Sequence, residues 1–244
     1  MIADFESFKA ELSLSKVEIC RELYRQNRAM IRIKNEEVAV GNLVRLIDST
    51  LRLTHQKGFE AMSLRDLCAD SGFSIGGLYA YIRNKQDLVS LIQGHGFMLT
   101  RRTILAYTQS LDDPRDKLAA AIKAHVYLSE LMQPWFYFSF MAAKSLPDSE
   151  KKAAIAMERE VEDMLYDILS QGVVLGVFST VNARLLASLC KAMMQDWYLK
   201  RAKYARQKTS ATDYAQFIVS VLNAYLLGKP GEPGAGKPAD LPSA

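Results

Sequence analysis

Cysteine is scarce in this chain, and that scarcity already excludes two classes of protein. Cys20, Cys68 and Cys190 are the only three, and more than forty residues separate each from the next. An odd number at this spacing fits neither a disulfide framework nor a thiolate metal site. We therefore expect reduced thiols, no bound metal and a location in the cytoplasm.

Long apolar runs and an export signal are also missing. The most apolar window, residues 131–143, is too short to span a bilayer and is interrupted by Pro134. At the N-terminus, Asp4 and Glu6 precede any apolar stretch, whereas a secretory signal has basic residues followed by an apolar segment. The sequence predicts a soluble protein that makes no membrane contact.

The common catalytic motifs are absent as well. No glycine-rich phosphate loop precedes a strand, no serine elbow occurs, and His55, His95 and His125 lack metal-ligand spacing. The net charge of +4, with 49% apolar and 24% charged residues, is that of an ordinary globular protein. We expect neither an enzyme nor a cofactor.

Proline and glycine are sparse except at the C-terminus. Four of the seven prolines and four of the 13 glycines fall in the last 17 residues, a composition that builds no core. We predict a disordered tail at 228–244. Through 42–227, apolar residues recur every three or four positions without period-two alternation, which predicts an all-α fold.

Capping residues divide this stretch into helices. Serine, asparagine or aspartate precedes most of the apolar periods, and glycine or proline follows many of them. The expected helices are 43–57, 64–71, 75–82, 85–107, 114–133, a short one ending near 145, 148–171, 183–203 and 211–227.

The first three of these helices have the arrangement of a helix-turn-helix unit, in which the third helix lies in the DNA major groove. On a helical wheel of 75–82, Ile75, Leu78 and Ile82 point inward, with Tyr79 beside them. Two adjacent glycines near a helix start cost roughly 1 kcal/mol each relative to alanine, which suits close approach to a groove wall. The expected outward face comprises Gly76, Gly77, Ala80 and Tyr81.

Polar side chains around this helix suit phosphate binding through hydroxyl and cationic groups. Because the outward face is bare, Arg65 is expected to add affinity and selectivity. The DNA-contacting residues predicted within the unit are Ser63, Arg65, Ser74, Ile75, Gly76, Gly77, Tyr79, Ala80, Tyr81 and Lys85.

Residues 42–91 resemble the DNA-binding region of the tetracycline-repressor-like (TetR) family of bacterial transcriptional regulators. The chain departs from the family pattern in having Gly77 where threonine or serine is usual, Ile82 for phenylalanine, and Thr54-His55 for Leu-Phe. The matching positions are Gly58-Phe59, Ser63, Asp66-Leu67, Gly72-Phe73-Ser74, Gly76, Leu78-Tyr79, Tyr81 and Lys85.

The resemblance implies a ligand-responsive regulator, most often a repressor, that binds a palindromic DNA operator as a homodimer. It divides the chain into an N-terminal extension (1–41), a helix-turn-helix domain (42–93) and a helical effector-binding and dimerisation domain (94–227). The last two helices are expected to pair with their copies in a second subunit. Their regularly spaced apolar residues, which ordinary core packing also explains, are Leu185, Leu186, Leu189, Met193, Trp197, Phe217, Val221, Leu222 and Tyr225.

Aromatic residues and methionines gather in this second half and predict an adaptable pocket for a small apolar or amphipathic effector. Each of them also suits an ordinary core. Lys191 and Arg201 are able to hold an acidic head group or to lie on solvated surface. The predicted ligand-binding residues are Tyr127, Trp135, Phe138, Met141, Met164, Met194 and Trp197.

Residues 15–34, within the N-terminal extension, carry a net charge of +4, so the rest of the chain nets zero. Residues 15–34 contain six basic and two acidic residues, in the pattern of an amphipathic helix with an arginine stripe. The apolar side, which includes Val17, Cys20, Tyr24 and Ile31, is able to dock the helix on the regulatory half. The alternative is that the stripe contacts DNA through Arg25, Arg28 and Arg32.

A second function is compatible with the same sequence: a helical carrier of lipids or acyl groups in which the three-helix region is only a scaffold. DNA affinity that falls steeply with salt distinguishes the regulator from the carrier.

Overall fold

The computed structural model describes residues 2–12, 15–146, 148–179 and 182–227. Within these ranges the regular structure is entirely helical, so the predicted all-α fold is confirmed. The predicted tail at 228–244 lies outside the described residues. The N-terminal helices are α1 (Phe5–Leu12), α2 (Lys16–Gln26), α3 (Glu36–Lys57), α4 (Leu64–Ser71), α5 (Ile75–Leu78) and α6 (Lys85–Thr108).

The second half of the chain contributes the other helices, with one short 3-10 turn, η1. Their bounds are α7 (Pro114–Leu131), α8 (Gln133–Ala142), η1 (Ala143–Ser145), α9 (Asp148–Val174), α10 (Ala183–Leu199), α11 (Arg201–Arg206) and α12 (Ala211–Leu226).

Most of the predicted helix starts are correct because the capping side chains act as expected. Each accepts a hydrogen bond from a backbone N–H in the first helical turn, which satisfies a donor that the helix itself leaves free. These caps are Ser15, Ser63, Ser74, Asn84, Asp113, Asn182 and Ser210.

Three expected boundaries were wrong. Helix α3 begins at Glu36, where Asn35 caps it, and not at residue 43. Helix α5 ends at Leu78, and the chain then turns through Tyr79–Tyr81. The helix expected at 183–203 breaks at Lys200, whose φ of −118° and ψ of 34° are not helical.

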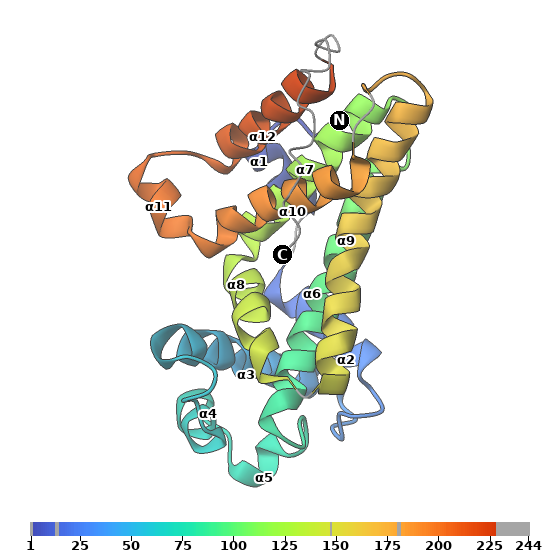
Figure 1. The fold of residues 1–244 in the computed structure, drawn as a ribbon. Coiled ribbons are helices and arrows are strands. Elements are labelled where there is room, and N and C mark those ends of the chain that lie inside the picture. The colour runs from blue at the N-terminus through green and yellow to red at the C-terminus, as the bar shows by residue number, and fades with distance from the viewer. Residues whose placement is uncertain (1, 13–14, 147, 180–181, 228–244) are drawn as a thin grey trace, which may run out of the picture.

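Two cores stabilise the molecule, and α6 runs through both. Leu88 and Ile92 belong to the core of the DNA-binding domain at the lower end of Figure 1, whereas Leu99 and Ile104 belong to the regulatory core above it. Trp135 on α8 packs against both cores. The boundary expected at 93/94 therefore lies within one continuous helix, which mechanically joins the two domains.

The N-terminal extension is part of the folded body and packs on both domains. On the regulatory side, the Phe8 ring of α1 is fully buried, with its centroid 5.6 Å from that of Tyr127. On the DNA-binding side, Leu23 and Tyr24 of α2 are fully buried in the core that α3 lines. The Arg32 N–H also donates to the Ala80 carbonyl at 2.8 Å, directly behind α5.

Deleting residues 1–34 should therefore destabilise the whole protein. Each large side chain buried by the extension contributes roughly 1.5–3 kcal/mol, so the loss should exceed about 5 kcal/mol in total. The midpoint of thermal unfolding should fall by more than about 10 °C, measured by circular dichroism. A matched variant, Arg32→Gln, changes only an exposed side chain and should retain the native midpoint.

Candidate DNA-binding surface and ligand pocket

The turn between α4 and α5 fixes the direction of the helix expected to meet DNA. Gly72 ends α4 with a φ of 74°, a left-handed conformation that glycine adopts without a Cβ penalty. Ser74 then begins α5, and its Oγ accepts from the Gly77 N–H at 3.1 Å. These contacts hold α5 at the lower tip of the molecule in Figure 1.

The start of α4 is held by a capping box that also occupies the Ser63 hydroxyl. Ser63 Oγ accepts from the Asp66 N–H at 3.1 Å and donates to Asp66 Oδ2 at 2.7 Å. The Lys57 ammonium, 2.8 Å from that carboxylate, and the bonds from Ser63 hold the pKa of Asp66 well below its usual range. The predicted phosphate contact through the Ser63 hydroxyl is not supported, because its proton is already donated within the cap.

The outer face of α4 and α5 exposes a mixture of apolar, bare and polar positions. Ile75 is 48% exposed and Tyr79 44% exposed, so the expectation that Ile75 points inward was wrong. The helix is only four residues long, and Leu78 is its buried residue, so Ile75 is not needed as a second anchor. The other exposed or half-buried predicted positions are Arg65, Ser74, Gly76, Gly77 and Ala80.

The two adjacent glycines differ in what the fold requires of them. A Cβ on Gly77 would lie 3.2 Å from Ser74 Oγ, so this glycine accommodates the cap of α5. A Cβ on Gly76 would meet nothing within 4 Å. The packing of the described residues therefore leaves room at Gly76 for a larger side chain.

Tyr81 is a core residue and does not point outward, so its predicted phosphate contact was wrong. The side chain is 1% exposed and packs edge-to-face on Phe73, with ring centroids 5.7 Å apart. Asn42 Nδ2 donates to its hydroxyl at 2.7 Å. Because α5 ends at Leu78, the helical wheel that turned Tyr81 outward does not apply.

The Lys85 side chain also turns inward, contrary to its predicted role as a phosphate ligand. Its ammonium donates to the carbonyls of Phe59 and Glu60, both at 3.0 Å, and of Met62 at 3.2 Å. The same ammonium lies 4.7 Å from the centroid of the Phe59 ring. With all three protons donated, Lys85 fastens the loop that precedes α4 to the start of α6.

Substitutions at Tyr81 should separate its core role from the predicted DNA contact. Tyr81→Ala removes a fully buried ring and should lower the free energy of unfolding by about 3–5 kcal/mol. Tyr81→Phe keeps the ring and should lower it by only about 1 kcal/mol, through the hydrogen bond from Asn42. Urea unfolding measures both. A phosphate contact instead predicts a Tyr81→Phe protein of native stability with weakened DNA binding.

The arginine stripe does not form one continuous helical face, because α2 ends at Gln26. Arg25 pairs with Glu36 at 2.8 Å. Arg28 donates to the Tyr24 hydroxyl and lies over its ring, with 5.0 Å between the guanidinium carbon and the centroid. Arg32 is exposed beyond the helix.

The docking alternative was correct in part. Cys20, Tyr24 and Ile31 are buried, but in the core of the DNA-binding domain and not on the regulatory half. Val17 is 45% exposed and does not dock. DNA contact by Arg25, Arg28 and Arg32 stays a prediction.

A cavity of about 230 Å³ lies between α6, α7, α8, α9 and α10; we call it the regulatory pocket. Most of its wall is apolar and aromatic, which suits a ligand with a hydrocarbon or ring body. The apolar lining consists of Phe97, Trp135, Phe136, Phe140, Ala143, Ala154, Ile155 and Val161.

One side of the regulatory pocket is polar and deeply buried. Lys191 on α10 is only 7% exposed, and burial lowers the pKa of its ammonium below that of an ordinary lysine. His125 on α7 is 1% exposed, and burial lowers the pKa of its imidazole well below the usual value. Sequence reasoning favoured solvated surface for Lys191. Its position among buried Ala187, Cys190 and Met194 on one face of α10 was the available signal.

The structure brings few of the predicted ligand-binding residues to a cavity. Trp135 lines the regulatory pocket, and Phe138 lines a second cleft while its ring packs on Phe59 at 5.7 Å. Met141 is 44% exposed and lines neither. Tyr127, Met194 and Trp197 fill the regulatory core, and Met164 packs against it; none of the four lines the regulatory pocket or the second cleft.

Arg201 is committed to an internal ion pair. Its guanidinium donates to both carboxylate oxygens of Glu130, at 2.7 and 2.9 Å, and lies over the Trp197 ring. Trp197 Nε1 donates to the same carboxylate at 3.0 Å. These contacts place Arg201 outside the regulatory pocket.

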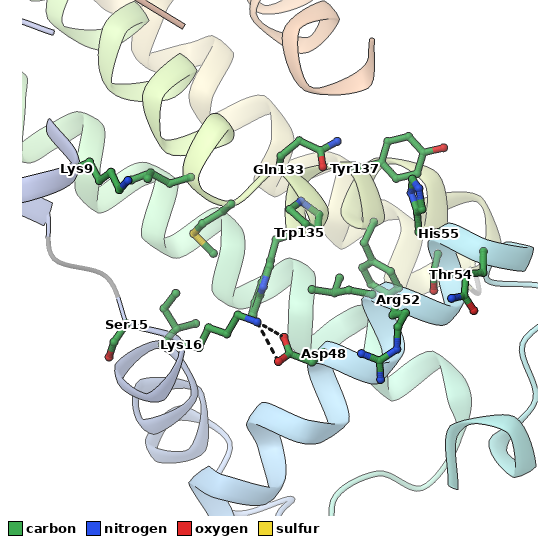
Figure 2. Close-up of a pocket in the computed structure, with 17 residues that line it drawn as sticks. Lys9, Ser15, Lys16, Asp48, Arg52, Thr54, His55, Gln133, Trp135 and Tyr137 are labelled. Carbon is green, nitrogen blue, oxygen red and sulfur yellow. Dashed lines mark hydrogen bonds and ion pairs between the residues drawn. The ribbon is translucent and has the colours of Figure 1, made fainter. Parts of the chain in front are cut away.

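The second cleft, of about 850 Å³, opens where α1, α2, α3 and α8 meet. Figure 2 shows Trp135 standing above the ion pair of Lys16 and Asp48, whose charged atoms are 2.8 Å apart. Thr54, near the end of α3, lines the same cleft. Trp135 borders both cavities, so α8 separates the regulatory pocket from the second cleft. Helix α3 of the DNA-binding domain lines the far side of that cleft.

An apolar face is exposed on α10 and α12. Of the regularly spaced residues, Leu186, Trp197 and Leu222 are buried, as the core alternative predicted. Five others are exposed by 42–66%, and all of these except Phe217 border a groove between the two helices. We call this surface the α10/α12 face; its exposed members are Leu185, Leu189, Phe217, Val221 and Tyr225.

Two family models match the chain, and together they cover more than half of it. Residues 46–92 match the bacterial regulatory proteins of the tetR family, and residues 111–221 match the tetracyclin repressor-like C-terminal domain. The chain belongs to the TetR family. Like other members, it is a transcription regulator with a helix-turn-helix DNA-binding domain and a helical ligand-binding domain. None of the curated proteins compared with this chain matches it.

Solved structures share the fold at low sequence identity. The TetR family regulator PfmR from Thermus thermophilus is 24% identical, with a TM-score of 0.62, covering 75% of this chain and 98% of its own. AibR in complex with isovaleryl coenzyme A and operator DNA is 20% identical, with a TM-score of 0.62 and coverages of 73% and 94%. FadR from Bacillus subtilis in complex with stearoyl-CoA is 16% identical, with a TM-score of 0.61 and coverages of 73% and 96%.

Across the described part of the chain, every helix is too short or too polar to cross a lipid bilayer.

Proposed function

We propose that this protein is a homodimeric repressor that binds a palindromic DNA operator and is released from it by a small amphipathic effector. The exposed outer face of α5 carries the first half of this proposal. Ile75, Gly76 and Tyr79 project from the tip of the molecule, where a major groove can receive them. Two such tips, related by a two-fold axis, would read the two halves of an operator.

The α10/α12 face supports the homodimer. Its exposed leucines and aromatic rings form a contiguous apolar surface of the kind that a soluble protein covers with a partner. A two-fold axis brings the same surface of a second chain against it, which buries all of these side chains at once.

The regulatory pocket is the proposed effector site. It is enclosed by five helices, is mainly apolar and carries a buried polar side, as expected for an amphipathic ligand. Fatty acids and acyl-CoA thioesters are therefore suitable first candidates, since AibR and FadR are relatives in fold whose structures contain acyl-CoA molecules.

Helix α8 supplies the proposed route from the effector to DNA. Phe136 and Phe140 face the regulatory pocket, whereas Phe138 packs on Phe59 in the DNA-binding domain. Phe59 in turn accepts the ammonium of Lys85 through its carbonyl. A ligand that displaces α8 would shift this contact and with it the loop that leads into α4.

The test is selection of DNA followed by release. Duplexes enriched from a random-sequence pool should bind with an affinity that falls steeply as salt rises. Members of a panel of fatty acids and acyl-CoA thioesters, from four to eighteen carbons, should then lower that affinity. Recovery of a bound lipid without any enrichment of DNA would instead support the helical carrier of lipids or acyl groups.

A further inference from the structure

The ammonium of Lys191 is buried without a hydrogen-bond acceptor among the described residues. Its nearest ion-pair partner is Glu158 on α9, and 3.8 Å separates Nζ from Oε1, which is beyond hydrogen-bond distance. The Glu158 carboxylate is itself 41% exposed and accepts a bond from Gln195. An ammonium removed from water with so weak a partner is destabilising unless another acceptor reaches it.

Two further polar groups on the same cavity are incompletely satisfied. His125 Nδ1 is buried and has no hydrogen-bond partner among the described residues. Gln93 donates through Nε2 to the Ser139 carbonyl at 2.6 Å, but its Oε1 is buried and unpaired. His125 and Lys191 are close enough for the lysine charge to lower the pKa of the imidazole. The buried polar side of the pocket is therefore short of partners.

We propose that the effector carries a carboxylate, and that this carboxylate binds Lys191 with His125 beside it. The proposal rests on the regulatory pocket being the effector site. A carboxylate supplies the acceptor that the ammonium lacks, and the neutral imidazole carries one N–H that can donate to the second carboxylate oxygen. The aromatic side of the pocket, with Phe136 and Phe140, receives the apolar body of the same molecule.

The charge of the pocket favours an acid over an amine or a neutral molecule of the same length. Lys144 and Lys151 lie on the lining together with Lys191, against the single carboxylate of Glu158. An organic cation would meet a buried like charge at Lys191. A neutral alcohol can accept a hydrogen bond from the ammonium but does not neutralise it, so it should bind more weakly.

Three probes of equal chain length separate these classes: decanoate, decan-1-ol and decylammonium. Binding to the full-length native protein is measured by calorimetry, with tryptophan fluorescence as a second signal, since Trp135, one of the two tryptophans, lines the pocket. Decanoate should bind at least about tenfold more tightly than decan-1-ol, the difference expected of a charged hydrogen bond. Decylammonium should bind most weakly.

Variants assign the preference to Lys191. Lys191→Met removes the charge but keeps most of the length of the side chain, and it should weaken decanoate about tenfold or more without weakening decan-1-ol. Glu158→Gln removes the competing carboxylate at a half-exposed position and should strengthen decanoate while leaving decan-1-ol unchanged. Lys152→Met, at an exposed lysine of α9 that does not line the pocket, is the matched control and should change decanoate binding less than about threefold.

Equal binding of decanoate and decan-1-ol by the native protein would overturn the proposal, as would native decanoate affinity in Lys191→Met. If Lys191→Met does not fold, an unchanged decanoate affinity in Glu158→Gln overturns it independently. If none of the three probes binds the native protein, both the carboxylate proposal and the regulatory pocket as effector site are contradicted. Release of DNA by a neutral effector alone would refute the carboxylate but leave the repressor function standing.

Discussion

Leucine in place of Gly76 is expected to abolish operator binding while the protein stays folded and dimeric. The expected loss is at least about 100-fold, because an isobutyl group on the outer face of α5 would hold the helix away from the groove wall. The fold should tolerate the change, since a Cβ on Gly76 meets nothing within 4 Å. Replacing a helical glycine also removes a penalty of roughly 1 kcal/mol, so stability should rise slightly.

The Gly76 experiment compares three proteins by fluorescence anisotropy on the selected duplex and by thermal unfolding. Gly76→Ala should have an intermediate affinity, which grades the effect by size. Gly94→Leu, on α6 and also without a neighbour within 4 Å of its Cβ, is the matched control and should bind like the native protein. Native affinity in Gly76→Leu would mean that the outer face of α5 does not lie against DNA.

Gly77 is a less informative site for the same question, although sequence analysis places both glycines on the same outward face. A Cβ there crowds the Ser74 cap at 3.2 Å, so Gly77→Leu should disturb α5 itself. Loss of DNA binding in that variant would not distinguish a blocked groove from a distorted helix.

The sequence was sufficient for the helices and most of their starts because those depend on local chemistry. A capping side chain acts on donors only two or three residues away, so Ser63, Ser74 and Asn84 could be assigned without tertiary information. Family resemblance supplied the two domains. The end of α5 was not predicted, because the helical wheel continued the helix beyond Leu78. The same error placed the buried Tyr81 on the outward face.

The pocket was harder to predict because a cavity depends on which helices meet. Aromatic residues and methionines indicated an apolar environment correctly, but composition does not separate a filled core from a hollow one. Trp197 and Met194 therefore looked equivalent to Trp135, although only Trp135 borders a cavity. Lys191 was a stronger indication of a cavity. A lysine on the apolar face of a helix requires an acceptor for its charge, and the sequence does not provide one.

Arginine at Leu189 is expected to give a folded monomer with little operator affinity. Leu189 is 53% exposed on the α10/α12 face, so the monomer loses no core packing. In a two-fold interface the substitution occurs twice and brings two like charges into an apolar contact. A monomer reads only one half-site, so affinity should fall by at least about 100-fold.

Light scattering should give the mass of one chain, and anisotropy should give the affinity. Leu105→Arg, at an exposed leucine of α6, is the control and should remain dimeric. A Leu189→Arg protein that still has the mass of two chains would place the dimer contact elsewhere.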